Sequence, residues 1–132
     1  MASYVPVAQS GKLLFLSGQL PLVEGKLPYV GKVGEGLTLS DGQKAAQIAV
    51  LNALSAIKSH CGSLDTVKGI IRMTVYVASA SGFTDQHLVA NGASDLLVQV
   101  FGTAGRHARL SLGSPVLPLD APVELEMIVE VA

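Results

Sequence analysis

The order in which strand and helix patterns follow one another is the feature that most constrains the fold of this chain. The patterns are, in order, two short strands around a turn at 10–11, a helix at 39–62, a strand at 70–77, a helix at 82–102, and strands at 108–113 and 123–131. Two helices among several strands favour an α+β sandwich, with both helices on one face of a sheet. A chain of 132 residues without an internal repeat or linker fits one domain, residues 1–132.

The first helix pattern carries signals at both of its ends. Ser40 and Gln43 have the spacing of a capping box, and Gly62 follows the last apolar residue as a C-terminal stop. Between these ends, apolar residues recur at helical spacing, at positions 46, 49, 50, 53, 54 and 57. The segment is therefore predicted to be an amphipathic helix with one buried face.

The second helix pattern has a less distinct start. Ser81 or Thr84 is a candidate N-cap, and Gly92 within the pattern costs a little helix stability. The predicted inner face consists of Val89, Ala93, Leu96, Leu97 and Val100. This helix is expected to pack beside the first one on the same face of the sheet.

The low content of charged residues predicts that part of the surface is buried against another subunit. Hydrophobic residues make up 49% of the chain and charged residues only 14%, against about 25% charged residues in an average soluble domain. The two helices cover one face of the sheet, and no third helix pattern remains for the other face. Both observations favour an oligomer that packs sheet to sheet. The simpler alternative is a monomer rich in Ala, Val and Leu.

The distribution of charge and apolar residues argues against two kinds of partner. The net charge is −1 and no run of Lys or Arg is present, so no nucleic-acid partner is expected. No apolar run approaches the length of a membrane span, and the start of the chain lacks the charged and apolar regions of a signal peptide. A cytoplasmic location without a membrane partner is therefore expected.

The cysteine and histidine content argues against a metal site. Cys61 is the single cysteine, which excludes an internal disulfide and fits a reducing compartment. His60, His87 and His107 lie on three different predicted elements, and none of the usual paired spacings of histidine ligands is present. No metal ligand set is therefore predicted.

The most unusual stretch is GRHARLSLGSPVLPLDAPVELE, residues 105–126. Arg109 begins one predicted strand, and Glu124 lies on the next, where Glu126 points to the same side. On antiparallel neighbouring strands, Arg109 and Glu124 would approach closely. The planar fork of arginine suits a carboxylate ligand, and a nearby glutamate can orient a water or move a proton. On spacing alone, a cross-strand salt bridge of little value to stability is the simpler interpretation.

The same stretch resembles the closing signature of the RidA/YjgF/YER057c/UK114 family. In that signature an arginine at a strand start is followed by Leu-Pro and then by a strand of the form V/I-E-L/I-E, and Arg109, the Leu-Pro pair and Glu124 stand at its spacing. The segment LLFLSGQLP is similar to the family's strand that ends in S-G-Q-[IL]-P. Tyr4 lies thirteen residues before Ser17, as it does in the family. The likeness spans almost the whole chain and indicates a divergent branch.

The resemblance implies a chorismate-mutase-like fold, which is a mixed sheet with two helices on one face. It also implies a homotrimer with clefts at the subunit interfaces. Active members hydrolyse reactive enamines and imines, such as 2-aminoacrylate and 2-iminobutanoate, to 2-keto acids and ammonia, and they need no metal or organic cofactor. The expected partners are thus a small carboxylated substrate and further copies of the chain.

Carried over by position, the resemblance assigns roles to individual residues. Arg109 would hold the substrate carboxylate and Glu124 would position the attacking water, so that these two residues form the catalytic pair. Tyr4 would line the cleft from the neighbouring subunit, and Ser17 and Gly18 would form part of the cleft wall. An imine carbon is already electrophilic once its nitrogen is protonated, so orientation, a water and proton transfer suffice for hydrolysis.

The chain departs from the family pattern beside the arginine. Leu110 stands where deaminating members usually have serine or threonine, and Ser111 stands where many have cysteine, although the main-chain contact expected at Ser111 needs no particular side chain. Asn91 in the second helix is a further candidate for a substrate contact. Arg106 and His107 are additional polar groups that either redirect specificity or belong to an ordinary solvated turn.

Two functions of other classes remain open at this stage. The first is a trimer that binds small carboxylates or partner proteins without catalysis, which would need Arg109 but not Glu124. The second is the endoribonuclease activity with which some relatives are labelled, and the low charge without a basic groove argues against it.

Overall fold

The computed structural model describes residues 3–132 of the chain. Its strands and helices are β1 (Val7–Ser10), β2 (Leu13–Leu16), β3 (Lys32–Val33), β4 (Gly36–Leu37), α1 (Leu39–Cys61), β5 (Val67–Ala78), α2 (Gln86–Phe101), β6 (Ala108–Ser114) and β7 (Val123–Val131). Short 3₁₀-helices lie at η1 (Leu64–Thr66), η2 (Gly102–Gly105) and η3 (Pro118–Asp120). The predicted order of the main elements is confirmed, and the short pair β3 and β4 lies in the loop before α1.

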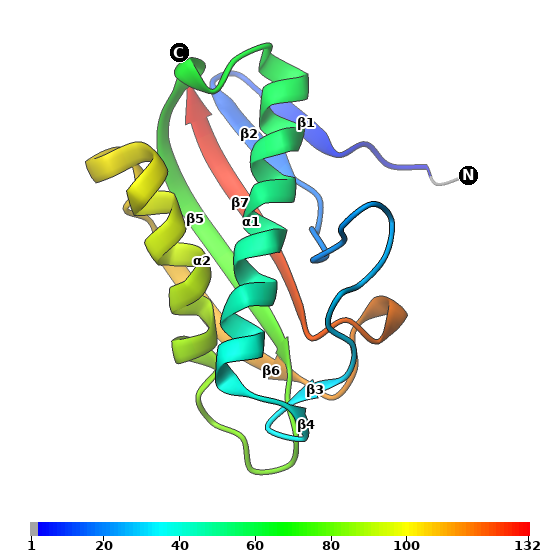
Figure 1. Cartoon of the computed structure of the whole chain (residues 1–132). Coiled ribbons are helices and arrows are strands. Elements are labelled where there is room, and N and C mark those ends of the chain that lie inside the picture. Colours follow the sequence, from blue (N-terminus) through cyan, green and yellow to red (C-terminus); the bar gives the residue numbers. More distant parts are fainter. Residues whose placement is uncertain (1–2) are drawn as a thin grey trace.

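The main sheet has the strand order β1-β2-β7-β5-β6. Within this main sheet, only β5 and β6 run parallel, because α2 carries the chain from the end of β5 back to the start of β6. The other strand pairs of the main sheet are antiparallel. Both helices lie on the same face of the sheet (Figure 1). The predicted mixed α+β fold, with two helices on one face, is confirmed.

The core lies between the helices and the inner face of the sheet. In β7 every second side chain is buried, and these residues are Val123, Leu125, Met127, Val129 and Val131. This alternation follows from the two-residue repeat of a strand, and it sends Glu124, Glu126 and Glu130 to the opposite face. On α1 the fully buried residues are mostly small, namely Ala45, Ala46, Ala49, Val50, Ala53 and Ile57. Small side chains allow α1 to approach both the sheet and α2 closely.

The closest approach of the two helices is at Gly92, which has a packing role that the sequence did not reveal. A Cβ atom built at Gly92 would lie 2.5 Å from the carbonyl oxygen of Gln43 in α1. The side-chain amide of Gln43 also donates a hydrogen bond to the carbonyl of Leu88 in α2, at 2.9 Å. Only glycine therefore permits this crossing, and the local loss of helix propensity is the consequence.

The inner face of α2 differs in part from the prediction. Val89, Ala93 and Leu97 are fully buried, and Leu96 is half-buried against the core. Val100 is 44% exposed, so its assignment to the core was wrong. In the last turn of α2 the residue that packs against the core is Phe101 instead.

The N-terminus of α1 begins earlier than predicted. Thr38 is the N-cap: the backbone N–H of Asp41 donates to the Thr38 hydroxyl at 3.1 Å, and the Thr38 N–H donates to the Asp41 carboxylate at 2.9 Å. Thr38 and Asp41 have the same spacing as Ser40 and Gln43, and a charged group near the helix start has an additional advantage. The backbone hydrogen bond from Thr38 is the main reason why the pKa of Asp41 is lowered.

The other helix ends confirm one prediction and correct another. Gly62 ends α1 in the left-handed conformation, with φ of 86°, and its N–H donates to the carbonyl of Lys58 at 2.7 Å. The N-cap of α2 is Asp85, rather than Ser81 or Thr84, and no side-chain hydrogen bond caps this end.

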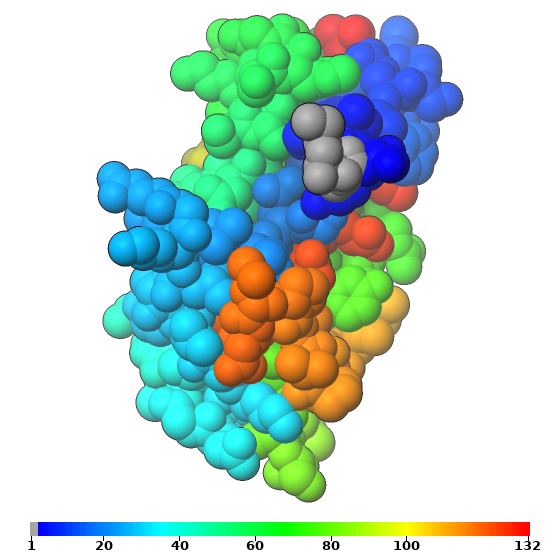
Figure 2. Space-filling model, turned by 90° about the vertical axis from the view of Figure 1, so that its right-hand side faces the viewer, coloured from blue at the N-terminus to red at the C-terminus, as the bar shows by residue number. Residues whose placement is uncertain are grey.

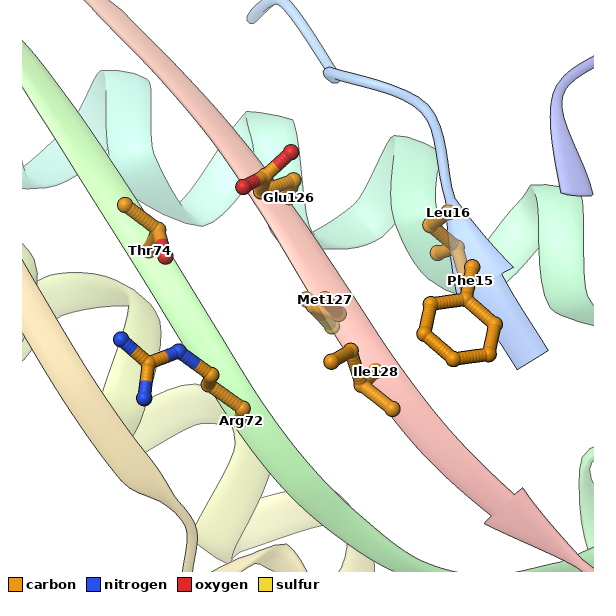
Figure 3. Close-up of a pocket in the computed structure, with 7 residues that line it drawn as sticks. All are labelled: Phe15, Leu16, Arg72, Thr74, Glu126, Met127 and Ile128. Atoms are coloured by element: carbon orange, nitrogen blue, oxygen red, sulfur yellow. The ribbon is translucent and has the colours of Figure 1, made fainter. Parts of the chain in front are cut away.

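The face of the sheet opposite the helices carries both apolar and charged side chains. Phe15 of β2 is 43% exposed there, and Ile128 of β7 is half-buried beside it. Arg72 and Glu126 come from the central strands β5 and β7, as Figure 3 shows. The side chains border a shallow hollow of about 180 Å³. We refer to this surface as the open face.

Replacing Thr38 by alanine is expected to lower the free energy of unfolding by about 1 kcal/mol, because the N-cap hydrogen bond to Asp41 is lost. The matched control is Ser40→Ala, which removes a hydroxyl two residues away that does not cap the helix. Urea unfolding monitored by circular dichroism compares the two variants. An equal loss in both variants would contradict the assignment of Thr38 as the cap.

Replacing Gly92 by alanine is expected to lower the free energy of unfolding by about 1–3 kcal/mol, because the added methyl group overpacks the helix crossing. Helix propensity alone predicts the opposite, a gain of about 1 kcal/mol. Gly69→Ala is the control, since a Cβ there meets nothing closer than 3.7 Å. A G92A variant as stable as the wild type in thermal or urea unfolding would refute the close packing.

Candidate functional site in two halves

The Ser-Gly-Gln segment after β2 is fixed by hydrogen bonds on both sides. The Ser17 hydroxyl donates to the carbonyl of Val5 at 2.6 Å, and the Ser17 N–H donates to the carbonyl of Pro6 at 2.9 Å. The backbone of Gln19 exchanges two hydrogen bonds with that of Leu125 in β7, at 2.7 and 3.1 Å. The segment thus joins the N-terminal residues to the middle of the sheet.

This pairing places Gly18 directly against the side chain of Glu124. A Cβ atom built at Gly18 would lie 2.5 Å from Oε2 of Glu124 and 3.0 Å from its carboxyl carbon. A larger residue at position 18 would displace the carboxyl group of Glu124, so the glycine helps to determine where this carboxyl group lies. The arrangement explains why two motifs that are distant in the sequence belong to one site.

The environment of Glu124 favours its protonated form. Partial burial raises the pKa of the Glu124 carboxyl above its ordinary value of 4.5, and the nearby carboxylate of Glu126 raises this pKa further. Both glutamates point to the open face, as the two-residue spacing predicted. The pKa of Glu124 therefore lies closer to neutrality than that of an isolated surface glutamate.

Tyr4 lies near this half of the site. Its side chain is 72% exposed and borders a hollow that Gly18, Leu20 and Glu24 also line. The N-terminal segment, the loop after residue 19 and the 114–120 loop share one side of the molecule, where Figure 2 shows them in dark blue, lighter blue and orange. The amide of Asn52 in α1 fixes the loop by donating to the carbonyls of Leu20 and Leu22, at 2.8 and 3.0 Å.

The second half of the site surrounds Arg109 on β6. One terminal nitrogen, Nη1, donates to Oδ1 of Asn91 at 2.9 Å and to the hydroxyl of Ser94 at 3.1 Å. The other, Nη2, donates to the carbonyl of His87 at 3.4 Å. All three acceptors are neutral groups on α2. These hydrogen bonds orient the guanidinium without neutralising its charge.

His107 joins the same half through two hydrogen bonds. Its Nδ1 lies 2.6 Å from the carbonyl oxygen of Gly105, and its Nε2 lies 2.9 Å from the hydroxyl of Ser94. Asn91 and His107 were both predicted to lie near the site, and the structure places both beside Arg109. Ser94 was not predicted, although it lies one helical turn after Asn91, and this i, i+3 spacing is the signal that could have identified it.

Strand alternation separates the neighbours of Arg109 on β6. Arg109 and Ser111 point toward α2, and both are half-buried. Leu110 between them points to the open face and is 46% exposed. The leucine that departs from the family pattern therefore lies on the opposite side of β6 from the Arg109 guanidinium.

The expected approach of Arg109 to Glu124 across neighbouring strands was wrong. Strand β5 lies between β6 and β7, and the two residues belong to opposite faces of the sheet. Arg109 is in register with the buried Met73 of β5, whereas Glu124 is in register with Tyr76, and cross-strand partners share a face. The crossover through α2 is the cause, because it returns β6 to the outer edge of β5. Within one copy, a salt bridge between Arg109 and Glu124 is thereby excluded.

Residues 3–132 contain neither a cluster of metal ligands nor a membrane-spanning helix. Among these residues, no group of three His, Cys, Asp or Glu side chains is placed so that it could hold a metal ion. No helix in this part of the chain is long and apolar enough to cross a membrane.

A mixed sheet with two helices on one face, a Ser-Gly-Gln segment paired to the last strand and an Arg-to-Glu closing segment define a chain of the YjgF type. The family described as "YjgF/chorismate_mutase-like, putative endoribonuclease" matches residues 1–131. The chain belongs to this family. The resemblance found in the sequence is confirmed.

Three relatives are each more than 35% identical to this chain. The chain is 43% identical to Protein TCP17 of Trypanosoma cruzi over 129 residues, which are 97% of this chain and 81% of that protein. It is 42% identical to Atu1372 of Agrobacterium tumefaciens, a crystal structure with unknown function, with a TM-score of 0.97 over 99% of this chain and 83% of that one. It is 36% identical to a putative endoribonuclease of Shewanella oneidensis, with a TM-score of 0.95 over 99% and 87% of the two chains. The fold alone extends to the YjgF gene product of E. coli, at 23% identity and a TM-score of 0.69 over 98% and 89%.

The raised pKa of Glu124 predicts a pH-dependent effect of Glu124→Gln on stability. A carboxyl group whose pKa is higher in the folded than in the unfolded chain loses stabilising effect as the pH rises from its ordinary pKa through the folded one. Glutamine is neutral at every pH, so the variant should gain stability over the wild type at about pH 8 and gain less at about pH 3.5.

Urea unfolding at both pH values measures this difference. Glu130→Gln is the control, because Glu130 lies on the same face of β7 but is exposed. An E124Q effect that does not change with pH would contradict the raised pKa.

Proposed function

We propose that the chain hydrolyses small enamine or imine carboxylates to 2-keto acids and ammonia, in sites shared by two copies of a trimer. The observation that carries this proposal is the separation of the two charged groups. Arg109 and Glu124 each lie in a preorganised setting, but they occupy opposite faces of the sheet with β5 between them. The reaction needs both an arginine that binds the substrate carboxylate and a glutamate that moves a proton. A second copy of the chain is the simplest means of bringing one of each into the same site.

The open face supports assembly through the sheet. It exposes the apolar side chains of Phe15 and Leu110, which are 43% and 46% exposed. Arg72 and Glu126 on the same face offer charges of opposite sign (Figure 3). A self-complementary surface of this kind suits contacts between identical copies. The low charge content of the chain, 14%, agrees with a surface that is partly buried in this way.

The chemistry assigned to Arg109 follows from its donors. A guanidinium held by neutral acceptors keeps its full charge for a substrate carboxylate, which it can bind through two parallel hydrogen bonds. Binding the carboxylate fixes the position of the adjacent C=N carbon. The entropy of orienting the substrate is then lost on binding rather than in the chemical step.

Glu124 is assigned the activation of the attacking water and the transfer of its proton. With its raised pKa, the carboxylate is a stronger base than an ordinary glutamate, and it can take a proton from the attacking water. Water adds to the protonated imine carbon to give a carbinolamine. Glu124 returns its proton to the carbinolamine nitrogen. The C–N bond then breaks and releases ammonia, while the hydroxyl group loses its proton to water as the C=O bond of the 2-keto acid forms. An enamine first takes a proton on carbon and becomes the imine.

Two other functions compete with this proposal. A trimer that only binds carboxylates would use Arg109 and dispense with Glu124. Endoribonuclease is the activity named in the descriptions of the family and of the Shewanella relative. The composition argues against it, because the 9 Lys and Arg residues are outnumbered by 10 Asp and Glu residues, and binding of a phosphate backbone depends largely on Lys and Arg.

A coupled assay is expected to show deaminase activity in the wild type. A pyridoxal-phosphate threonine dehydratase generates 2-iminobutanoate, and the rate of 2-keto acid formation is followed. Arg109→Lys retains the charge but loses the fork, and Glu124→Gln retains the shape but loses the base, so both variants should fall by about 100-fold or more. Glu130→Gln should keep wild-type activity.

Mixing the two inactive variants tests the shared site. When Arg109→Lys and Glu124→Gln chains are unfolded, mixed in equal amounts and refolded together, about a quarter of the interfaces should combine an intact Arg109 with an intact Glu124. About a quarter of the wild-type activity should then return. Absence of recovery in a mixture that forms trimers would refute the shared site. An inactive wild type that binds 2-oxobutanoate would support the binding protein instead.

A further inference from the structure

The guanidinium of Arg109 is the first member of a chain of hydrogen bonds that ends at a backbone carbonyl. It runs from Nη1 of Arg109 to the hydroxyl of Ser94 (3.1 Å), from there to Nε2 of His107 (2.9 Å), and from Nδ1 of His107 to the carbonyl of Gly105 (2.6 Å). We propose that Ser94 and His107 are positioning residues, which hold Arg109 so that its remaining donors face the substrate carboxylate. This inference rests on the proposed function for the identity of the ligand.

The acceptors determine the direction of each bond in this chain. A carbonyl oxygen can only accept, so Nδ1 of His107 carries the proton that is donated to Gly105. In the neutral imidazole, Nε2 is then an acceptor, and the Ser94 hydroxyl donates a hydrogen bond to it. The hydroxyl oxygen in turn accepts from Arg109. The two middle members, Ser94 and His107, each accept one hydrogen bond and donate the next in the same direction, which is the arrangement that strengthens a hydrogen-bond network.

The far end of the chain is anchored rigidly. Gly105 is buried, and a Cβ atom built there would collide with the backbone carbonyl of Leu97 in α2. The 3₁₀-helix η2 is therefore packed directly on α2 at this point. The acceptor for His107 is thus part of the same rigid body as Ser94 and Asn91, which hold the other end.

The pattern of occupied donors on Arg109 matches a carboxylate ligand. Arginine has five N–H donors. Asn91 and Ser94 take both of those on Nη1, and the carbonyl of His87 takes one on Nη2. Two donors remain, Nε–H and one Nη2–H, and they form the Nε–Nη2 edge of the guanidinium plane when the carbonyl of His87 takes the Nη2–H that points toward Nη1. This edge presents two parallel donors, as a bidentate contact with a carboxylate requires.

The hydrogen bonds through Ser94 and His107 restrict the rotation of the Arg109 guanidinium. Without Ser94, Nη1 would keep a single partner, and without His107, the Ser94 hydroxyl could rotate away from Arg109. In either case the free edge would lose its fixed direction. Substrate binding would then have to immobilise Arg109, at an entropic cost that appears in KM rather than in the chemical step.

Four variants test the chain of bonds. Ser94→Ala removes its middle member, and Ser94→Thr retains a hydroxyl. His107→Asn retains a donor for Gly105 near the place of Nδ1 but cannot reach Ser94. Gln99→Ala is the control, because Gln99 lines the same hollow as Arg109 and takes no part in the chain of bonds.

A first measurement needs neither ligand nor activity. Nitrogen-15 NMR of the Arg109 side chain, assigned by comparison with Arg109→Lys, reports how fast the guanidinium rotates. Rotation should accelerate by about tenfold in S94A and H107N, since a hydrogen bond to a charged group is lost or weakened. S94T and Q99A should resemble the wild type. Unchanged rotation in folded S94A would overturn the proposal.

A second measurement uses the deaminase reaction. S94A and H107N should raise KM for 2-iminobutanoate by about tenfold and change kcat by less than about twofold, and S94T should restore KM. The double variant S94A/H107N should be no worse than either single variant, because both interrupt the same chain. Additive losses, or losses in kcat alone, would overturn the positioning role.

The two proposals can fail separately. If the wild type shows no deaminase activity, the proposed function fails, whereas the NMR rotation still decides whether Ser94 and His107 hold Arg109. In that case the affinity for 2-oxobutanoate, measured by NMR titration, replaces KM as the second reading. If deamination proceeds and S94A matches the wild type in both measurements, only the positioning role is refuted.

Discussion

The antiparallel pairing of β7 with β5 in the middle of the sheet is the interaction on which the rest of the structure depends. It directs Val123, Leu125 and the following odd-numbered residues of β7 to the helices, and Glu124 and Glu126 to the open face. The backbone of Leu125 also receives Gln19, which brings Gly18 against Glu124. A shift of β7 by one residue would bury the glutamates and expose the core, so the register is strongly determined.

Features that depend on local repeats could be predicted from the sequence, and features that depend on long-range choices could not. The alternation in β7 and the helical spacing in α1 identified the elements, because burial repeats with the period of the backbone. Thr38 and Ser40 offer capping boxes two residues apart, and the charge of Asp41 near the helix start is too small an advantage to decide between them from the sequence. The position of β6 was mistaken, since a strand that follows a helix can join either the edge of β5 or the edge of β7.

The candidate site shows the same limit at the level of residues. Motif spacing identified Arg109, Glu124 and Gly18, because signatures at strand starts and turns are visible in a linear sequence. Ser94 was missed, because its i, i+3 spacing from Asn91 shows only that the two residues share a face of α2. That Arg109 and His107 reach this face depends on how η2 folds back onto α2. The separation of Arg109 from Glu124 was equally invisible, since it follows from the strand order rather than from either motif.

The separation of the two charged groups has a physical advantage in the proposed trimer. An arginine and a glutamate placed within reach of each other in one folded chain would form an ion pair, which would lower the pKa of the glutamate and occupy the donors meant for the substrate. Here Arg109 is held by neutral groups on α2, and Glu124 lies across the sheet, where burial and Glu126 raise its pKa. Each group can therefore acquire its reactive state during folding. Assembly would then need only to bring two prepared halves to the distance that one small carboxylate and one water can span.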